Sequence, residues 1–357
     1  MIKTLDAVPN ELILGGINLF LRSLTLASKF GLLIYIGRYM SLSDLGIYSI
    51  LVGIVYVSTQ ILGLDFYQFN TRQILSAISS RRTGFVFGQL RLHFFSYFII
   101  LLPLFFILQY LIPASLMDGF VIIGIIFCEH FSQELYRLFV TLKRPLFANL
   151  QLFIGQGVPL VSFMAVSSVY TEIRNVDSLV IFWLCGVLSS SILGIFVIVR
   201  TMKRHLIYYP DKEWVVTGIK VAAPFFIMTM FGLIILWSDR FLLNFYLREH
   251  DVGIYSFCVN IAATLWLFMS TGFLAIISPK LIEAYKMGDM KLYELIQRRL
   301  DRGLLLGGFF GILVLSVIFP VLVSIMDKPE LGENAHIFYI LLIGSYVNIL
   351  AMSSYYK

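Results

Sequence analysis

The sequence predicts an all-α polytopic membrane protein. Of its 357 residues, 59% are hydrophobic and only 13% are charged, and the mean hydropathy is +0.87. A soluble domain carries about a quarter charged residues. Apolar stretches of about 20 residues, the length that crosses a bilayer, recur from one end of the chain to the other. An internal repeat further indicates two related halves.

Short polar connectors such as "SLSD" and "TEIRNVD" divide the apolar stretches into about ten predicted spans. We expect them at residues 12–36, 45–69, 85–113, 119–142, 146–170, 178–200, 221–247, 252–278, 303–326 and 336–356. The first is too long and too charged for a cleavable signal peptide. Cys128, Cys185 and Cys258 lie inside apolar stretches without disulfide or metal spacing, and we expect small core residues there.

The distribution of cations predicts a cytoplasmic N-terminus. With that orientation, nineteen of the 27 Lys and Arg residues fall in cytoplasmic segments, four in outer loops and four within spans. The net charge of +6 is then explained by anionic lipid headgroups, and we expect no nucleic-acid partner. The outer loops are too short for a large catalytic domain. We find no nucleotide-binding, catalytic-triad or zinc motif and expect no enzyme activity.

A repeat relates the two halves. "LSDLGIYSILVGI" begins at Leu42 and "EHDVGIYSFCVNI" at Glu249, so the shared Gly-Ile-Tyr-Ser recurs at an offset of 207. Downstream, "TRQI" at 71–74 matches "PKLI" at 279–282 with a one-residue shift. Each copy follows an outer loop and enters an inward-running span, which makes the repeat parallel.

The repeat predicts the domain organisation. We expect a first lobe of six spans over residues 1–200, a cytoplasmic linker over 201–220, and a second lobe over 221–357 with four spans present. A second lobe of six spans would extend to about residue 410. The second lobe is therefore expected to be incomplete.

Several motifs carry a resemblance to a known family. They are "GRYMSLSDLGIYS" with "LGLDFYQFNTRQI", "EHFSQELYRLFVTLKRPLFANL", and "SDRFLLNFYLREHDVGIYS" with "SPKLIEAY". In this order the chain resembles the multidrug/oligosaccharidyl-lipid/polysaccharide exporter superfamily, in its branch of O-antigen and capsule oligosaccharide flippases. The resemblance implies two pseudo-symmetric lobes around a central cavity. It also implies an undecaprenyl-diphosphate-linked oligosaccharide as substrate, flipped to the outer leaflet of the bacterial inner membrane, with polysaccharide polymerase and chain-length proteins as further partners.

One face of the first span is polar along its whole length. Steps of three and four residues place on this face Glu11, Gly15, Asn18, Arg22, Thr25 and Lys29. In a bilayer such a stripe must face protein or water. We expect Asn18, Arg22, Thr25 and Lys29 to line the cavity, with the two cations receiving the diphosphate and acidic sugars. The alternative pairs the cations permanently with acids on other helices, for which the candidates are Asp65, Glu129, Glu134 and Asp239.

Charged residues in two other spans are candidates for coupling and gating: Glu129, His130, Glu134, Asp239 and Arg240. Glu134 can pair with Arg137 three residues on. His130 is either a proton relay or a hydrogen-bonded interface residue. Asp239 and Arg240 diverge by about 100° on a helix and are not expected to pair. We expect no cofactor or metal, and a proton or sodium gradient as the energy source.

The sequence therefore favours a flippase that works by alternating access. A multidrug/cation antiporter of the same superfamily is the first alternative, although the two cations of the first span disfavour a cationic substrate. A lipid-II flippase differs mainly in substrate. A membrane glycosyl polymerase is disfavoured by the short outer loops and the repeat, and a scaffold role is a further alternative.

Overall fold

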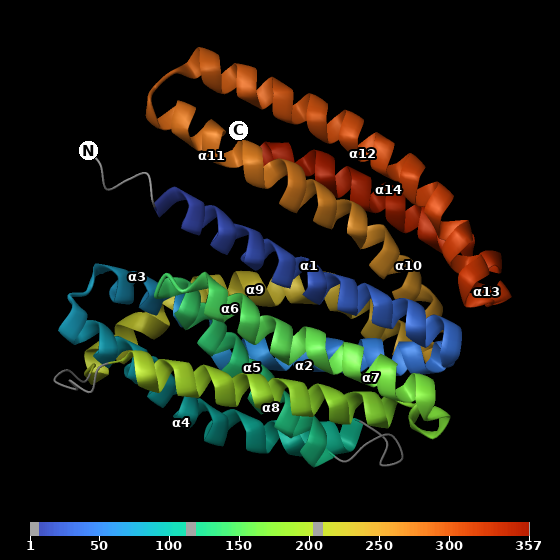
Figure 1. The fold of residues 1–357 in the computed structure, drawn as a ribbon, viewed down its shortest axis with the longest axis horizontal. Helices are drawn as coiled ribbons and strands as arrows, with labels where there is room; N and C mark the ends of the chain where they lie inside the picture. The colour runs from blue at the N-terminus through green and yellow to red at the C-terminus, as the bar shows by residue number, and fades with distance from the viewer. Residues whose placement is uncertain (1–6, 112–118, 203–209, 357) are drawn as a thin grey trace. The chain divides into compact units, whose positions relative to one another are not determined.

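The computed structural model describes residues 7–111, 119–202 and 210–356, and in these ranges the chain consists of helices joined by short turns, with no strand (Figure 1). Nine of the described helical segments are long and apolar enough to cross a membrane. The predicted all-α, polytopic membrane architecture is confirmed.

The α-helices are α1 (Ala7–Tyr39), α2 (Leu42–Gly63), α3 (Tyr67–Ser76), α4 (Ser79–Leu111), α5 (Gly119–Thr141), α6 (Pro145–Leu152), α7 (Val158–Val169), α8 (Val176–Thr201), α9 (Lys212–Tyr246), α10 (Glu249–Phe268), α11 (Ala275–Lys286), α12 (Met290–Met326), α13 (Pro329–Glu333) and α14 (Ala335–Ala351). Short π-helical turns, η1 (Phe153–Gly157) and η3 (Met269–Leu274), join α6 to α7 and α10 to α11. Two 3₁₀ turns are η2 (Thr171–Ile173) and η4 (Met352–Tyr356). Helix α5 coincides with the predicted span 119–142 but is not among the nine apolar segments, because its polar residues lower its hydropathy.

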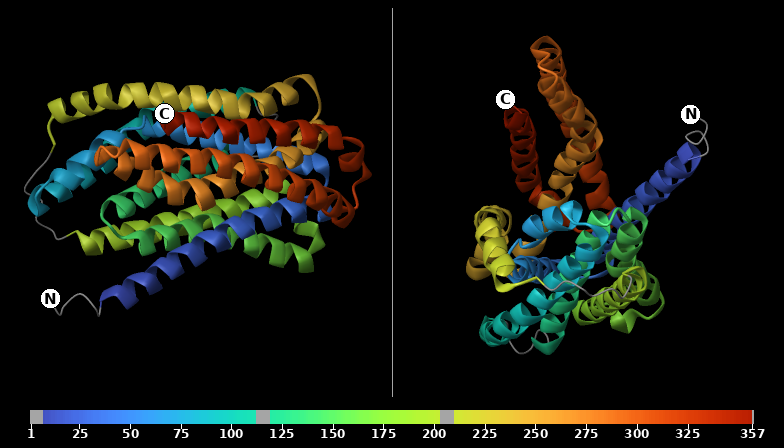
Figure 2. Two further views of the ribbon diagram at one scale, coloured as in Figure 1. Left: turned by 90° about the horizontal axis from the view of Figure 1, so that it is seen from above. Right: turned by 90° about the vertical axis from the view of Figure 1, so that its left-hand side faces the viewer.

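The chain divides into two compact units. Unit 1 contains residues up to Leu32 and Ile50–Phe241, and unit 2 contains Leu33–Ser49 and Leu242–Lys357. Both division points near the N-terminus, and the one after Phe241, fall inside continuous helices, so α1, α2 and α9 each belong to both units. Figure 2 shows the same helices from two further directions.

The second predicted span, 45–69, is wrong at its end. Helix α2 stops at Gly63, and Leu64 and Asp65 adopt left-handed φ angles of 48° and 50° before α3 begins. Aspartate tolerates this conformation better than most residues. The Asp65 side chain is buried, and it accepts a hydrogen bond of 2.6 Å from Thr229 Oγ1 on α9, which holds the turn in place.

The two copies of the repeat begin their helices in the same way. At the start of α2, Asp44 accepts a hydrogen bond from the backbone N–H of Ser41 at 3.0 Å. At the start of α10, Asp251 accepts one from the backbone N–H of Arg248 at 3.3 Å. Both pairs occupy equivalent positions of the repeat, and each satisfies an N–H group that the helix leaves unpaired.

The repeat copies also pack against each other within unit 2. A Cβ atom added at Gly46 would overlap the carbonyl oxygen of Glu249, and one added at Gly253 would overlap that of Leu42. Three residues after each glycine, Ser256 Oγ donates to Ser49 Oγ at 2.9 Å. The four positions are related by the offset of 207, so the contact is locally two-fold symmetric. Small residues allow this close backbone approach, as they do in many membrane helix pairs.

The one-residue shift in the downstream part of the repeat falls where the two copies differ in structure. In unit 2 the chain continues from α10 through the π-helical turn η3 into α11. In the first copy the equivalent stretch contains the turn at Leu64 and Asp65 between α2 and α3.

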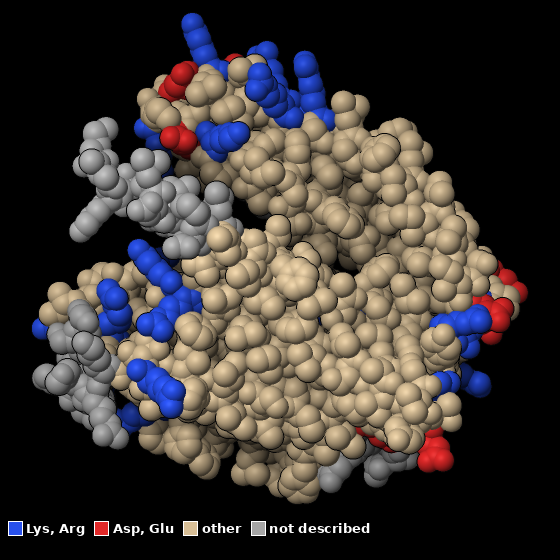
Figure 3. All heavy atoms as spheres, in the orientation of Figure 1, with Lys and Arg blue, Asp and Glu red and all other residues tan. Residues whose placement is uncertain are grey.

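Each unit has its own core. In unit 1, Phe66, Phe69 and Phe85 surround Trp214, the first-turn tryptophan of α9. In unit 2, Phe319 on α12 stacks on Phe338 of α14 with ring centroids 4.0 Å apart. Charged side chains gather toward the helix ends, and the surface between them is largely apolar (Figure 3), as expected of helices that cross a bilayer.

Candidate functional site

The polar stripe of α1 faces the other helices of unit 1. Arg22 Nη2 donates to the hydroxyl of Tyr136 on α5 at 3.0 Å, and Lys29 Nζ donates to Gln156 Oε1 in η1 at 2.8 Å. Asn18 Oδ1 accepts from Asn149 Nδ2 on α6 at 2.9 Å.

Thr25 is buried but differs from its neighbours on the stripe. Its hydroxyl donates to the carbonyl of Leu21 in its own helix at 2.9 Å. The side chain of Glu11 lies outside the described residues.

Neither cation of the stripe pairs with a carboxylate of a described residue. The acids considered as partners have other contacts: Asp65 with Thr229, Glu134 with Arg137, Asp239 with Arg240, and Glu129 with neutral donors. In the part of the chain that the structure describes, Arg22 and Lys29 therefore have neutral oxygen acceptors as partners.

Beside these contacts lies a polar pocket of about 270 Å³. Its walls come from α2, α5, α6 and η1, and carry four side-chain amides, two phenols, a carboxylate and a guanidinium. The lining residues are Tyr56, Gln60, Glu129, Ser132, Gln133, Tyr136, Arg137, Gln151, Leu152, Gly155 and Gln156. Such a concentration of hydrogen-bonding groups inside a membrane bundle is typical of a binding site for a polar ligand.

Gln156 connects Lys29 to the carboxylate of Glu129. Its Oε1 accepts from Lys29, and its Nε2 donates to Glu129 Oε1 at 2.7 Å. Glu129 also accepts from Gln133 Nε2 at 3.4 Å and from Trp183 Nε1 at 3.3 Å. The π-helical turn η1 carries Gln156, and such turns occur frequently at functional sites.

Glu134 lies in a buried cluster that adjoins the pocket through Arg137. It accepts hydrogen bonds from Gln89, from Arg137 at 2.5 Å and, when His93 carries its proton on Nε2, from His93 at 3.2 Å. His130 Nδ1 lies 2.7 Å from the Tyr97 hydroxyl. The expected pairing of Glu134 with Arg137 is confirmed.

The ligand atoms of His93, His130 and Glu134 lie within 4.8 Å of one another, a spacing that a metal ion could bridge. The Arg137 guanidinium, however, already balances the Glu134 carboxylate. A divalent cation would leave this buried cluster with a net charge of +2, which is costly in a low-dielectric interior. The arrangement fits a hydrogen-bonded ion-pair network that joins α4 to α5.

The expectation that Asp239 and Arg240 do not pair is wrong. Arg240 Nη1 lies 3.5 Å from Asp239 Oδ1, and the same oxygen accepts from the Arg240 backbone N–H at 2.7 Å. The carboxylate folds back over its own helical turn, and the long arginine side chain reaches it. The guanidinium also donates to the Leu236 carbonyl and lies 4.7 Å from the Trp237 ring.

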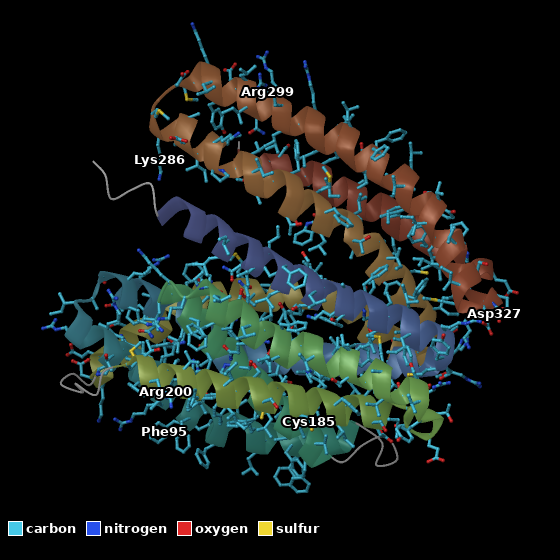
Figure 4. The ribbon with its side chains drawn as sticks, viewed as in Figure 1. Phe95, Cys185, Arg200, Lys286, Arg299 and Asp327 are labelled. Atoms are coloured by element: carbon cyan, nitrogen blue, oxygen red, sulfur yellow. The ribbon has the colours of Figure 1, made fainter. Side chains whose placement is uncertain are left out.

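The cysteines are free within the described part of the chain. Cys128 and Cys258 are buried as expected, whereas Cys185 is exposed on α8, where it contributes to the apolar outer surface (Figure 4).

The chain matches no protein-family model, no curated protein and no solved structure.

Proposed function

We propose that this protein is a flippase for oligosaccharides linked to undecaprenyl diphosphate, which it moves from the cytoplasmic to the outer leaflet of the bacterial inner membrane by alternating access. The observation that carries the proposal is the pair of cations, Arg22 and Lys29, on one face of a membrane helix, where their partners among the described residues are neutral side chains. A cation in this setting favours a mobile anion as its counter-charge. A lipid diphosphate is such an anion, and the family resemblance of the sequence points to the same substrate.

The pocket beside the cations suits a sugar. Its volume of about 270 Å³ is below the size of sites for drug-like molecules, so it admits a small polar group such as one sugar residue. Gln60, Gln133 and Gln151 offer both donors and acceptors, and Tyr56 and Tyr136 offer hydroxyls and flat apolar rings. Such a mixture matches a sugar ring, which carries hydroxyls at its edge and apolar C–H groups on its faces.

Glu129 favours a second candidate, a cation antiporter, because a carboxylate in a pocket attracts a cationic drug. Three neutral donors already bind its two oxygens, from Gln133, Gln156 and Trp183. Glu129 therefore has less capacity for a ligand than the two cations have, which makes the flippase the stronger candidate.

Complementation of a deletion strain tests the proposal. We expect loss of the protein to abolish surface polysaccharide and to accumulate lipid-linked repeat units on the cytoplasmic face. Arg22→Gln removes the charge but retains a side chain that can bond to Tyr136, and it should fail to restore export. Tyr136→Phe removes the neutral partner of Arg22 and one pocket hydroxyl but leaves the charge and the aromatic ring, so it should impair export less than Arg22→Gln does.

Protein abundance in the membrane is measured in parallel for each variant. Normal export by both Arg22→Gln and Lys29→Gln would contradict the proposal. Normal glycan in the deletion strain, combined with raised sensitivity to cationic drugs, would instead support the antiporter.

A further inference from the structure

A second, larger cavity lies in unit 1, separate from the polar pocket. It is a groove of about 640 Å³ between residues 87–95 of α4 and the first turn of α9. Its walls are mainly apolar, and they include Phe87, Leu90, Leu92, Phe95 and Val215. None of these residues takes part in the contacts of Arg22 or Lys29.

Close packing holds the two sides of the groove together. A Cβ atom added at Gly88 would lie 2.6 Å from Pro210 Cγ and 3.4 Å from the Trp214 ring. Trp214 in turn stacks on Phe85 with ring centroids 6.0 Å apart, inside the core of unit 1. The groove is therefore formed by the packed protein itself, without the need for a ligand to shape it.

The groove is continuous with a surface that faces lipid. Phe95 is 52% exposed and lies on the outer side of α4 (Figure 4). The neighbouring Phe94, Phe98 and Ile99 of the same apolar helix are also more than half exposed. An acyl chain can pass from the bilayer into the groove along this surface.

Two cations lie on the groove wall, one at the start of α9 and one twelve residues after the start of α4. Arg91 on α4 and Lys212 at the first position of α9 are both exposed, and neither forms an ion pair with a described carboxylate. Asp211 also lines the groove, but its Oδ1 accepts the Trp214 backbone N–H at 2.9 Å and caps α9. Basic residues between membrane helices at the bilayer interface are typical of sites for anionic headgroups.

We propose that this groove binds one anionic phospholipid, with an acyl chain along the apolar wall and the phosphate at Arg91 and Lys212. The occupant is a lipid of the surrounding leaflet, because the groove opens on the lipid-facing side of α4. The groove selects a headgroup with a net negative charge, because a zwitterionic lipid would bring its own ammonium group close to the two cations, which repel it. The proposal is independent of the function of the polar pocket.

Fluorescence quenching tests the proposal directly, because Trp214 lines the groove. Protein in phosphatidylcholine nanodiscs is titrated with phosphatidylglycerol or phosphatidylcholine that carries bromine on the acyl chains. Two cations at about 1 kcal/mol each, opposed by about 1 kcal/mol from the Asp211 carboxylate, predict that phosphatidylglycerol quenches at a mole fraction about fivefold lower. Trp214→Phe should remove this selective quenching. Equal quenching of the wild-type protein by the two lipids would overturn the proposal, and this comparison needs no variant.

Charge variants locate the headgroup. Arg91→Gln with Lys212→Gln should abolish the preference, whereas the matched pair Lys286→Gln with Arg299→Gln, exposed cations of unit 2, should preserve it (Figure 4). Asp211→Asn keeps a side chain that can cap α9 but removes the negative charge, so it should increase the preference about fivefold. An unchanged preference in the Arg91/Lys212 variant would overturn the proposal, as would displacement of the phospholipid by equimolar undecaprenyl phosphate.

Discussion

Replacing Gly46 by alanine tests the contact between the two copies of the repeat. The new Cβ would lie 1.9 Å from the backbone oxygen of Glu249, whereas Cβ atoms in proteins essentially never approach another atom closer than 3.0 Å. A backbone oxygen cannot rotate aside as a side chain can. Helices α2 and α10 must therefore separate by about 1 Å.

The Gly46→Ala substitution has two effects that lower the stability of the folded protein and one that raises it. Overpacking costs about 1–3 kcal/mol. The 2.9 Å hydrogen bond between Ser49 and Ser256 is lost, and leaving two buried hydroxyls unpaired costs about 1 kcal/mol. Alanine in place of glycine favours the helix by about 1 kcal/mol. The net destabilisation is then about 2 kcal/mol.

Thermal unfolding of the purified protein in detergent measures the effect. For the cooperative unfolding of a chain of 357 residues, a loss of about 2 kcal/mol corresponds to a fall in Tm of roughly 3 °C. Gly344→Ala is the matched control, because Gly344 lies in a helix of the same unit with no atom within 4 Å of the added Cβ. We expect its Tm to stay unchanged or to rise.

The double variant Gly46→Ala with Gly253→Ala provides a second test. One separation of the helices relieves both overlaps. The double variant should therefore be destabilised clearly less than the sum of the destabilisations of the two single variants. A Gly46→Ala protein as stable as the Gly344→Ala control would refute this account of the repeat contact, as would fully additive effects of the two glycine substitutions.

Two further substitutions test buried polar contacts. Glu134→Gln leaves the Arg137 guanidinium without its counter-charge and should destabilise the protein by about 3–5 kcal/mol. Thermal unfolding measures this loss, and a change below about 1 kcal/mol would contradict the ion-pair assignment. Thr229→Val removes the donor to the buried Asp65 carboxylate and should cost about 1–3 kcal/mol, with faster proteolysis at the α2–α3 turn, while protection of that turn equal to wild type would argue against its role.

The helices could be predicted because the bilayer imposes a simple rule on the sequence. A span needs about 20 apolar residues, and the connectors of this chain are short and polar. The rule fails where a helix is broken without a change in hydropathy. The turn at Leu64 and Asp65 depends on left-handed backbone angles and on a hydrogen bond from Thr229, which is distant in sequence.

Only the residues that α1 contributes to the candidate site could be predicted from the sequence. Helical spacing placed Asn18, Arg22 and Lys29 on one face of α1, and that face does contact polar residues. The partners Tyr136 and Gln156 could not be identified, because a pattern along one helix does not specify which helix lies opposite. Gln156 further depends on a π-helical turn that breaks the α-helical spacing.

Part of the cluster around Glu134 could have been predicted from the spacing of polar residues in the sequence. Gln89, His93 and Tyr97 follow one another at steps of four on α4, inside an otherwise apolar span, and all three are buried. The rule that identified the stripe of α1 would have placed them on one face. The pairing of Asp239 with Arg240 was missed for the opposite reason, since side-chain length can overcome the divergence of adjacent positions on a helix.

Equilibrium binding of undecaprenyl diphosphate to the protein in neutral-lipid nanodiscs tests the central claim most directly. Two charge-assisted hydrogen bonds at roughly 1.5 kcal/mol each predict that Arg22→Gln with Lys29→Gln raises the Kd about 100-fold. The same charge change at Arg91 and Lys212, in the lipid groove, should leave the Kd within about twofold of wild type. Equal affinity of the wild-type protein and the Arg22/Lys29 variant would contradict the claim that these two cations receive the anionic headgroup.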